Sequence, residues 1–179
     1  MNARAKLLIP VAVFSVMLGL LFFGLNPERD LNYVPSALVN RPLPVFALPD
    51  LFDENGTISS SELTGGIFLV NVWGTWCPPC HQEHPYLVEI SENEPQYTWI
   101  GVNYKDDLED ARDFLDERGN PFAKTVVDID GSLGIDFGVT AAPETFVVDS
   151  TGTIRYRHVG PINHEIWAEI FEPILAQIR

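Results

Sequence analysis

The chain has 179 residues, of which 46% are hydrophobic and 20% are charged, so it can bury the core of one domain. Its formal net charge is −14, and all 25 acidic residues lie at or after Glu28. An acidic body repels phosphate, which argues against nucleic acid as a partner. The two cysteines, Cys77 and Cys80, are too close together to form a disulfide scaffold, so we expect them to have a chemical role.

The N-terminal segment is apolar and uncharged over 19 residues, from Leu7 to Leu25, with Pro10 near its start. A run of this length can cross a bilayer as a helix. Because Arg4 and Lys6 precede it, we expect the N-terminus to stay in the cytoplasm and the rest to be exported. A cleaved signal peptide is the alternative, but the bulky residues 22–25 offer no small-x-small cleavage site, which favours an uncleaved anchor.

These features predict three parts of the chain: a membrane anchor over residues 1–25, a polar tether over 26–38 and a folded domain over 39–179. The anchor implies a single-pass protein of a bacterial inner membrane, with its folded domain in the periplasm.

The first half of the folded domain contains a short apolar stretch, Pro44–Leu48, which predicts an edge strand, and a turn at Asp53–Gly56. Residues 67–73 form a nearly continuous run of branched and aromatic residues, which is typical of a central strand covered on both faces. A helix is expected to begin at the cysteines and to be kinked at Pro85.

The second half alternates strands and helices. Asp106 with Glu109 predicts the start of a helix that ends at Gly119. The other expected elements are strands at 99–102, 125–127 and 145–148, a turn at 149–152, a hairpin partner at 154–159 and a final helix over 166–178. This order predicts a layered α/β domain with a mixed central sheet flanked by helices.

The segment from Val70 to Cys80 joins a buried strand to a Cys-Pro-Pro-Cys helix start, and it resembles the thioredoxin superfamily. At a helix N-terminus, free N–H groups and the helix dipole favour a thiolate. Cys77 is therefore expected to be the attacking thiol and Cys80, one turn further on, the resolving thiol. We expect no cofactor apart from the reversible disulfide between them.

Two details modify this expectation. Pro78 and Pro79 carry no N–H, so the Cys77 thiolate has to rely on donors from Cys80 onward. Asn71 stands where thioredoxins usually carry a buried acid, so Glu83 and Glu144 become the candidates for handling protons. Nearby carboxylates raise the pKa of a thiol, and a less stable thiolate indicates a reductant.

The string Cys77-Pro78-Pro79-Cys80-His81 also satisfies the haem attachment pattern Cys-x-x-Cys-His. The methionines, Met1 and Met17, lie in the predicted anchor and cannot supply a distal ligand, although His158 or His164 could serve. Zinc is a third possibility, but His81 and His84 are too close on one helix to complete a good tetrahedron with both cysteines.

A second signature lies in the string from Gly138 to Phe146, where Ala142-Pro143-Glu144 precedes a strand. Thioredoxin-like folds place a cis-proline at this point beside the redox cysteines, which predicts a cis bond at Pro143 and a backbone that pairs with an extended substrate. Trp76 is expected to be an exposed contact beside Cys77, whereas His158, Trp99 and Trp167 are expected to be structural.

The longer pattern resembles the cytochrome c maturation thioredoxins, the DsbE/CcmG type, over nearly the whole chain. The pattern consists of the string Gly-Val-x-x-Ala-Pro-Glu-Thr-Phe at residues 138–146, together with residues 73–78, 82–84, 103–107 and 154–158. The chain departs from the family at Pro79, where threonine is common, and at Ala141, where glycine is common. Glu83 and Glu144 match acidic positions near that family's active site.

This resemblance implies a reductant for the haem-binding cysteines of apocytochrome c, or for another haem-ligation component, recharged by a membrane thiol–disulfide transporter. The rival functions are a general periplasmic oxidase, a broader thiol reductase, and a c-type haem or metal carrier.

Overall fold

The computed structural model describes residues 3–24 and 38–178. The chain divides into two units, Met1–Leu31 and Asn32–Arg179. Most of the predicted tether, residues 26–37, lies outside the described residues.

The first unit contains helix α1, Ala3–Gly24, with Pro10 inside it. This helix covers the segment for which the sequence predicts a membrane-crossing helix, except for Leu25, which is not among the described residues. Within residues 3–24 and 38–178, no helix is both long enough and apolar enough to cross a membrane.

The second unit is built on a five-stranded sheet in the order β5-β4-β3-β6-β7. These strands are β3 (Phe68–Trp73), β4 (Thr98–Tyr104), β5 (Lys124–Asp128), β6 (Glu144–Val148) and β7 (Ile154–Val159). Strands β3, β4 and β5 run parallel to one another. Strand β6 runs antiparallel to its neighbours β3 and β7, so the predicted mixed sheet is confirmed. Because β3 is buried along its whole length, its apolar run meets packed side chains on both faces.

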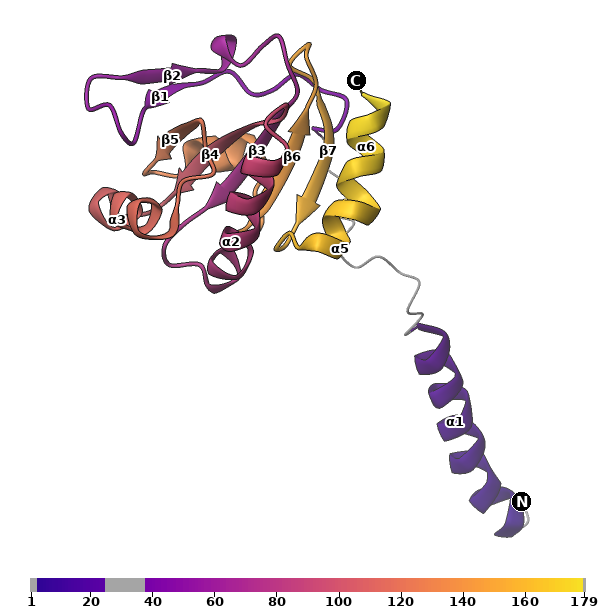
Figure 1. Ribbon diagram of the computed structural model, residues 1–179. Helices are drawn as coiled ribbons and strands as arrows, with labels where there is room; N and C mark the ends of the chain where they lie inside the picture. The colour runs from indigo at the N-terminus through magenta and orange to yellow at the C-terminus, as the bar shows by residue number, and fades with distance from the viewer. Residues whose placement is uncertain (1–2, 25–37, 179) are drawn as a thin grey trace. The chain divides into compact units, whose positions relative to one another are not determined.

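One face of the sheet is covered by α2 (Pro78–Asn93), α3 (Leu108–Arg118) and the C-terminal helical segment (Figure 1). The connections β3-α2-β4 and β4-α3-β5 run in the same direction across the sheet, so right-handed crossovers place both helices on this face. The core between these layers includes Trp99 and Trp167, which are 1% and 3% exposed, as expected of structural tryptophans.

The other face is covered by the hairpin β1 (Ala47–Pro49) and β2 (Thr57–Ser59), the 3-10 turn η1 (Ser60–Glu62) and the short helix α4 (Ser132–Asp136). The predicted turn at Asp53–Gly56 joins β1 to β2, and the Gly56 N–H donates to the Asp53 carbonyl at 2.8 Å. The strand predicted at Pro44–Leu48 is found further along the chain, at Ala47–Pro49, and its partner β2 and helix α4 are additional to the sequence prediction.

Two helix predictions need correction. The N-cap of α3 is Asp107, whose carboxylate accepts from the N–H groups of Glu109 and Asp110, and not Asp106, which bonds elsewhere. The final helix has three parts: α5 (His164–Ile166), a π-turn η2 (Trp167–Phe171) and α6 (Glu172–Gln177). Pro173 accounts for the π-turn, because it has no N–H and its ring would collide with the Glu169 carbonyl in a regular helix.

Candidate active site

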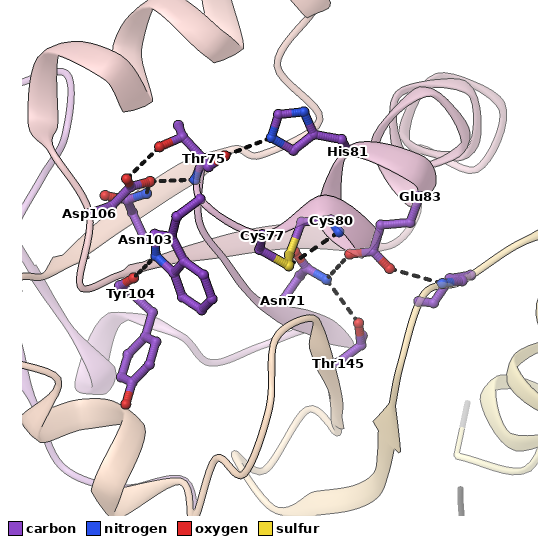
Figure 2. Close-up of a disulfide and its surroundings, with 12 residues drawn as sticks. Asn71, Thr75, Cys77, Cys80, His81, Glu83, Asn103, Tyr104, Asp106 and Thr145 are labelled. Carbon is purple, nitrogen blue, oxygen red and sulfur yellow. Dashed lines mark hydrogen bonds between the residues drawn. A yellow bond between two sulfur atoms is a disulfide. The ribbon is translucent and has the colours of Figure 1, made fainter.

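The two cysteines lie where β3 leads into α2, and they form a disulfide with a Cα–Cα distance of 5.3 Å (Figure 2). A turn joins strand to helix, closed by the Cys77 N–H, which donates to the Gly74 carbonyl at 3.2 Å. Cys77 is the N-cap of α2, and both cysteines are at most 3% exposed. The helix starts at the motif as predicted, and it continues through Pro85.

The sulfur of Cys77 receives one backbone hydrogen bond at the helix start. The Cys80 N–H donates to Cys77 Sγ at 3.2 Å, while Pro78 and Pro79 occupy the first two helical positions without an N–H to give. In the disulfide form, the donor at this sulfur is thus the Cys80 N–H, in keeping with the expected reliance of the thiolate on donors from Cys80 onward. A helix start of this kind stabilises a thiolate less than one with two or three free amides.

Glu83 is a buried carboxyl group on α2, only 1% exposed and three residues beyond Cys80. It accepts hydrogen bonds from Asn71 Nδ2 and from the Ile162 N–H, each at 2.9 Å (Figure 2). Burial raises the pKa of Glu83 from 4.5 to about 7, although these two hydrogen bonds act in the opposite direction. The group can therefore take up or release a proton near neutral pH.

Asn71 links Glu83 to strand β6, because its Nδ2 also donates to Thr145 Oγ1 at 3.0 Å. As an amide, Asn71 does not ionise near neutral pH, so the titratable group next to it is Glu83. The pairing of Asn71 with Glu83 thus supports the expectation that an acid elsewhere replaces the missing strand acid.

The bond between Ala142 and Pro143 is cis, as predicted, and it lies just before β6. The Pro143 carbonyl accepts from the Gly160 N–H at 2.9 Å. Among the described residues, no protein group bonds the backbone N–H or C=O of Ala142. Ala142 therefore offers the free backbone of this loop to an extended partner chain.

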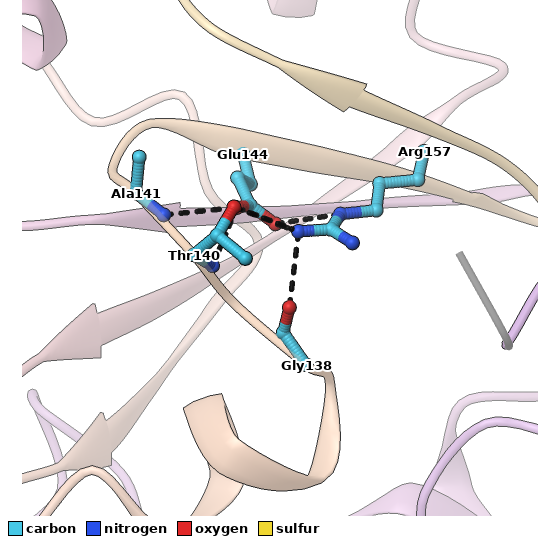
Figure 3. Close-up of polar contacts among 5 residues, drawn as sticks. All are labelled: Gly138, Thr140, Ala141, Glu144 and Arg157. Atoms are coloured by element: carbon cyan, nitrogen blue, oxygen red, sulfur yellow. Dashed lines mark hydrogen bonds and ion pairs between the residues drawn. The ribbon is translucent and has the colours of Figure 1, made fainter. Parts of the chain in front are cut away.

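Glu144 has a different position from the one expected of a proton-handling group. Its fully buried carboxylate forms a double hydrogen bond with Arg157, at 2.8 Å for each contact (Figure 3). The same carboxylate accepts from the backbone N–H groups of Thr140 and Ala141 and from the Thr140 hydroxyl. Both oxygens are occupied, so the observed contacts give Glu144 the role of holding the cis-proline loop in place.

Trp76 is 51% exposed beside Cys77, as expected of a contact residue. Its indole N–H donates to the Tyr104 carbonyl at 3.0 Å. The preceding residue, Thr75, is bound by Asp106, a contact that the sequence does not reveal.

The histidines of the motif are bound to backbone carbonyls. His81 Nε2 donates to the Thr75 carbonyl at 2.7 Å, and His84 Nε2 donates to the Gly119 carbonyl at 2.9 Å. Both rings also contact Phe114 of α3. Burial lowers the pKa of His84, because it disfavours the charged form of the imidazole. These contacts give both histidines a packing role between α2 and α3, and they count against the haem and zinc interpretations.

His158 is buried on β7 and its ring lies edge-on to Phe171, with 5.6 Å between ring centres. This position supports the structural role expected for it. Over the described ranges 3–24 and 38–178, no group of three or more His, Cys, Asp or Glu side chains could hold a metal ion.

Comparison with curated proteins finds relatives along the whole chain. A protein of Allochromatium vinosum named thiol:disulfide interchange protein DsbE is 46% identical over 180 residues, covering 100% of this chain and 98% of the relative. The proteins of the same name from Pseudomonas aeruginosa and Escherichia coli K12 are 41% and 42% identical, each over 175 residues. They cover 98% and 96% of this chain, and 95% and 94% of the respective relative.

Solved structures give the same fold. The crystal structure of a proposed DsbE from Chlorobium tepidum matches with a TM-score of 0.66 and 26% identity, over 76% of this chain and 94% of that chain. A secreted thiol-disulfide isomerase from Corynebacterium glutamicum matches with a TM-score of 0.68 at 22% identity, over 84% and 95% of the two chains, which supports the fold alone.

The family model for Redoxin matches residues 38–171, which hold the disulfide, the buried Glu83 and the cis-proline loop. With this match and full-length relatives at 41 to 46% identity, the chain belongs to the Redoxin family, among the thiol:disulfide interchange proteins of the DsbE type.

Proposed function

We propose that this thiol–disulfide oxidoreductase works as a reductant, with electrons flowing outward from Cys77 and Cys80 to the disulfide of a partner protein. The observation that carries the proposal is the single N–H donor to Cys77 Sγ, combined with the buried Glu83 on the same helix. A poorly stabilised thiolate makes the dithiol form less favourable, so the protein gives up its electrons more readily.

The reaction begins when the Cys77 thiolate attacks one sulfur of the partner's disulfide. The partner's S–S bond breaks, its other sulfur leaves as a thiolate, and a mixed disulfide joins Cys77 to the partner. Cys80 then loses its proton and attacks Cys77 Sγ. The Cys77–Cys80 bond forms as the mixed disulfide breaks, so two electrons pass from the protein to the partner, whose two thiolates take up protons.

Glu83 is suited to accept the proton of Cys80. It lies one helical turn beyond Cys80, and a pKa of about 7 leaves a large fraction ionised at neutral pH and ready to take a proton. The protonated carboxyl can pass this proton on to the leaving thiolate of the partner. The hydrogen bonds from Asn71 and Ile162 hold the carboxyl group in one orientation for both steps.

The partner is expected to bind along the cis-proline loop. The free backbone of Ala142 can pair with an extended segment, and the exposed ring of Trp76 can contact the residues around the partner's cysteine. Both features lie at the end of the sheet where Cys77 is found, so one extended chain can reach all three.

We further propose that the partner is apocytochrome c, or another haem-ligation component, and that a membrane thiol–disulfide transporter restores the reduced form. The support is the DsbE name of the full-length relatives and the family resemblance of the site residues. A strain lacking this protein should lose its c-type cytochromes and regain them when a thiol reductant is added to the medium. Loss that the reductant does not restore would contradict the reductant role.

The partner itself can be captured through the mixed disulfide. A Cys80→Ser variant keeps the attacking thiol but cannot resolve the intermediate, so it should accumulate the partner as an adduct that a reductant releases. Mass spectrometry of the adduct should identify peptides that carry a Cys-x-x-Cys-His sequence. Adducts with unrelated secreted proteins would favour a general thiol reductase.

Membrane attachment and a periplasmic location are part of the same proposal. They rest on the uncharged run Leu7–Leu25 and on the basic residues before it. A protein that resists extraction by alkaline carbonate, and whose folded domain is digested by protease in spheroplasts, would support this topology. Release of the protein into the soluble fraction would contradict it.

A further inference from the structure

Thr75 lies two residues before Cys77, in the turn from Gly74 to Cys77. Side chains from outside this turn form hydrogen bonds with three atoms of Thr75. Asp106 accepts from the Thr75 backbone N–H at 2.6 Å and from its hydroxyl at 2.5 Å. His81 Nε2 donates to the Thr75 carbonyl at 2.7 Å (Figure 2). We call this set of contacts the Thr75 clamp. Its bonds involve neither cysteine, so opening the disulfide breaks none of them.

Asp106 is itself fixed to the sheet. It accepts from Asn103 Nδ2 at 2.8 Å and from the Asp107 N–H at 3.0 Å. Asn103 is 1% exposed and pairs with Trp73 in the β3–β4 register. The carboxylate thus receives four hydrogen bonds from groups anchored to β4, α3 and the turn, which gives the clamp a rigid base.

The residues on either side of Thr75 are restrained as well. The Trp76 indole N–H donates to the Tyr104 carbonyl at 3.0 Å, and the indole folds over Gly74. A Cβ added to Gly74 would lie 2.5 Å from Trp76 Nε1, so this position requires glycine for the indole to stay there. The whole turn from Gly74 to Cys77 is therefore attached to the end of β4.

From these contacts we propose that Asp106 is a positioning residue for disulfide closure, acting through Thr75. When the disulfide opens, the S–S bond no longer holds Cys77 Sγ next to Cys80 Sγ. The clamp keeps the turn in the geometry of the closed form, so the two thiols remain at high effective concentration. Ready closure makes the disulfide more stable and the protein a stronger reductant.

The experiment measures the equilibrium constant for Cys77–Cys80 closure against a glutathione buffer, using the full chain in detergent. Asp106→Ala should lower this constant at least tenfold, which corresponds to a reduction potential about 30 mV less negative. Thr75→Val, which loses the hydroxyl donor alone, should give a smaller decrease, and Thr75→Ser should restore the wild-type value. Asp107→Ala is the matched control, because it removes a neighbouring carboxylate and a helix cap without touching Thr75.

Asp106→Asn separates positioning from charge. It removes the charge but keeps one oxygen that can accept from Thr75, so the clamp predicts a closure constant between those of wild type and Asp106→Ala. The proposal would be overturned if Asp106→Asn had the same closure constant as Asp106→Ala while Thr75→Val closed like wild type. A decrease in Asp107→Ala as large as that in Asp106→Ala would also overturn it. If Asp106→Ala does not fold, the contrast between Thr75→Val and Thr75→Ser decides the question.

Discussion

The buried carboxyl of Glu83 should make the stability of the protein depend on pH, and replacement by glutamine should remove this dependence. Burial raises the pKa of Glu83 from 4.5 to about 7 in the folded protein. The unfolded chain, in which the group is exposed, keeps the lower value. Between these two pH values the folded state binds more protons than the unfolded state, so the free energy of unfolding decreases as pH rises.

The size of this effect follows from the two pKa values. At about 1.4 kcal/mol per pKa unit, the difference between 4.5 and about 7 corresponds to about 3 kcal/mol. This stability is fully present below pH 4.5 and is lost as pH rises through 7. Glu83→Gln also loses a hydrogen-bond acceptor, but that cost is the same at every pH.

The assay is urea unfolding of the oxidised unit, residues 32–179, at several values between pH 4.5 and 8. The free energy of unfolding of wild type relative to Glu83→Gln should fall by about 3 kcal/mol over this range. The exposed Glu165→Gln serves as the control and should follow wild type. The reasoning would be refuted if the difference in the free energy of unfolding between wild type and Glu83→Gln stayed constant with pH. Glu83 would then ionise in the folded protein as it does in the unfolded chain.

Three other perturbations have outcomes that follow from single contacts. Pro79→Ala adds an N–H that can point at Cys77 Sγ, so it should lower the Cys77 pKa in a thiolate absorbance titration, whereas Pro78→Ala should change it less. Arg157→Met leaves the fully buried Glu144 carboxylate without its cation, so urea unfolding should show a loss of about 3 to 5 kcal/mol, much of which Arg157→Met with Glu144→Gln should recover. Phe171→Ala removes a fully buried ring that contacts Trp167, Tyr156 and His158, and it should cost about 3 to 5 kcal/mol in the same assay.

Each of these expectations can fail in a distinct way. Equal Cys77 pKa values in wild type and Pro79→Ala would mean that the helix start does not limit the thiolate. A double variant no more stable than Arg157→Met would mean that the ion pair is not what Arg157 contributes. A cost below about 1 kcal/mol for Phe171→Ala would mean that the core around the π-turn collapses without strain.

The main strands and helices of the fold could be predicted because their residues carry strong patterns. The apolar run at 67–73 corresponds to β3, and the hairpin partner at 154–159 corresponds to β7. By contrast, β2 has three residues and α4 has five, which is too short for a period to be visible. Their positions follow from packing on the second face of the sheet, where Ile58 and Leu133 are buried.

The redox pair could be predicted because its two cysteines lie close together in sequence, whereas the cis bond at Pro143 was expected only from the resemblance to thioredoxin-like folds. The roles of the carboxylates depend on contacts between distant segments. Glu83 and Glu144 are both buried acids, but only the structure shows that Arg157 binds Glu144 while Asn71 and Ile162 bind Glu83. The sequence around Asp106 indicates only a helix start, because its contact with Thr75 spans 31 residues and leaves no local signal.

The most direct test of the central claim is the equilibrium reduction potential of the Cys77–Cys80 pair in the full chain, measured against a glutathione or dithiothreitol buffer. A value at or below about −200 mV, on the side of thioredoxin at about −270 mV, is the result that the reductant account predicts. A value near about −120 mV, that of the strong oxidant DsbA, would contradict it, because the protein would then make disulfides in its partners.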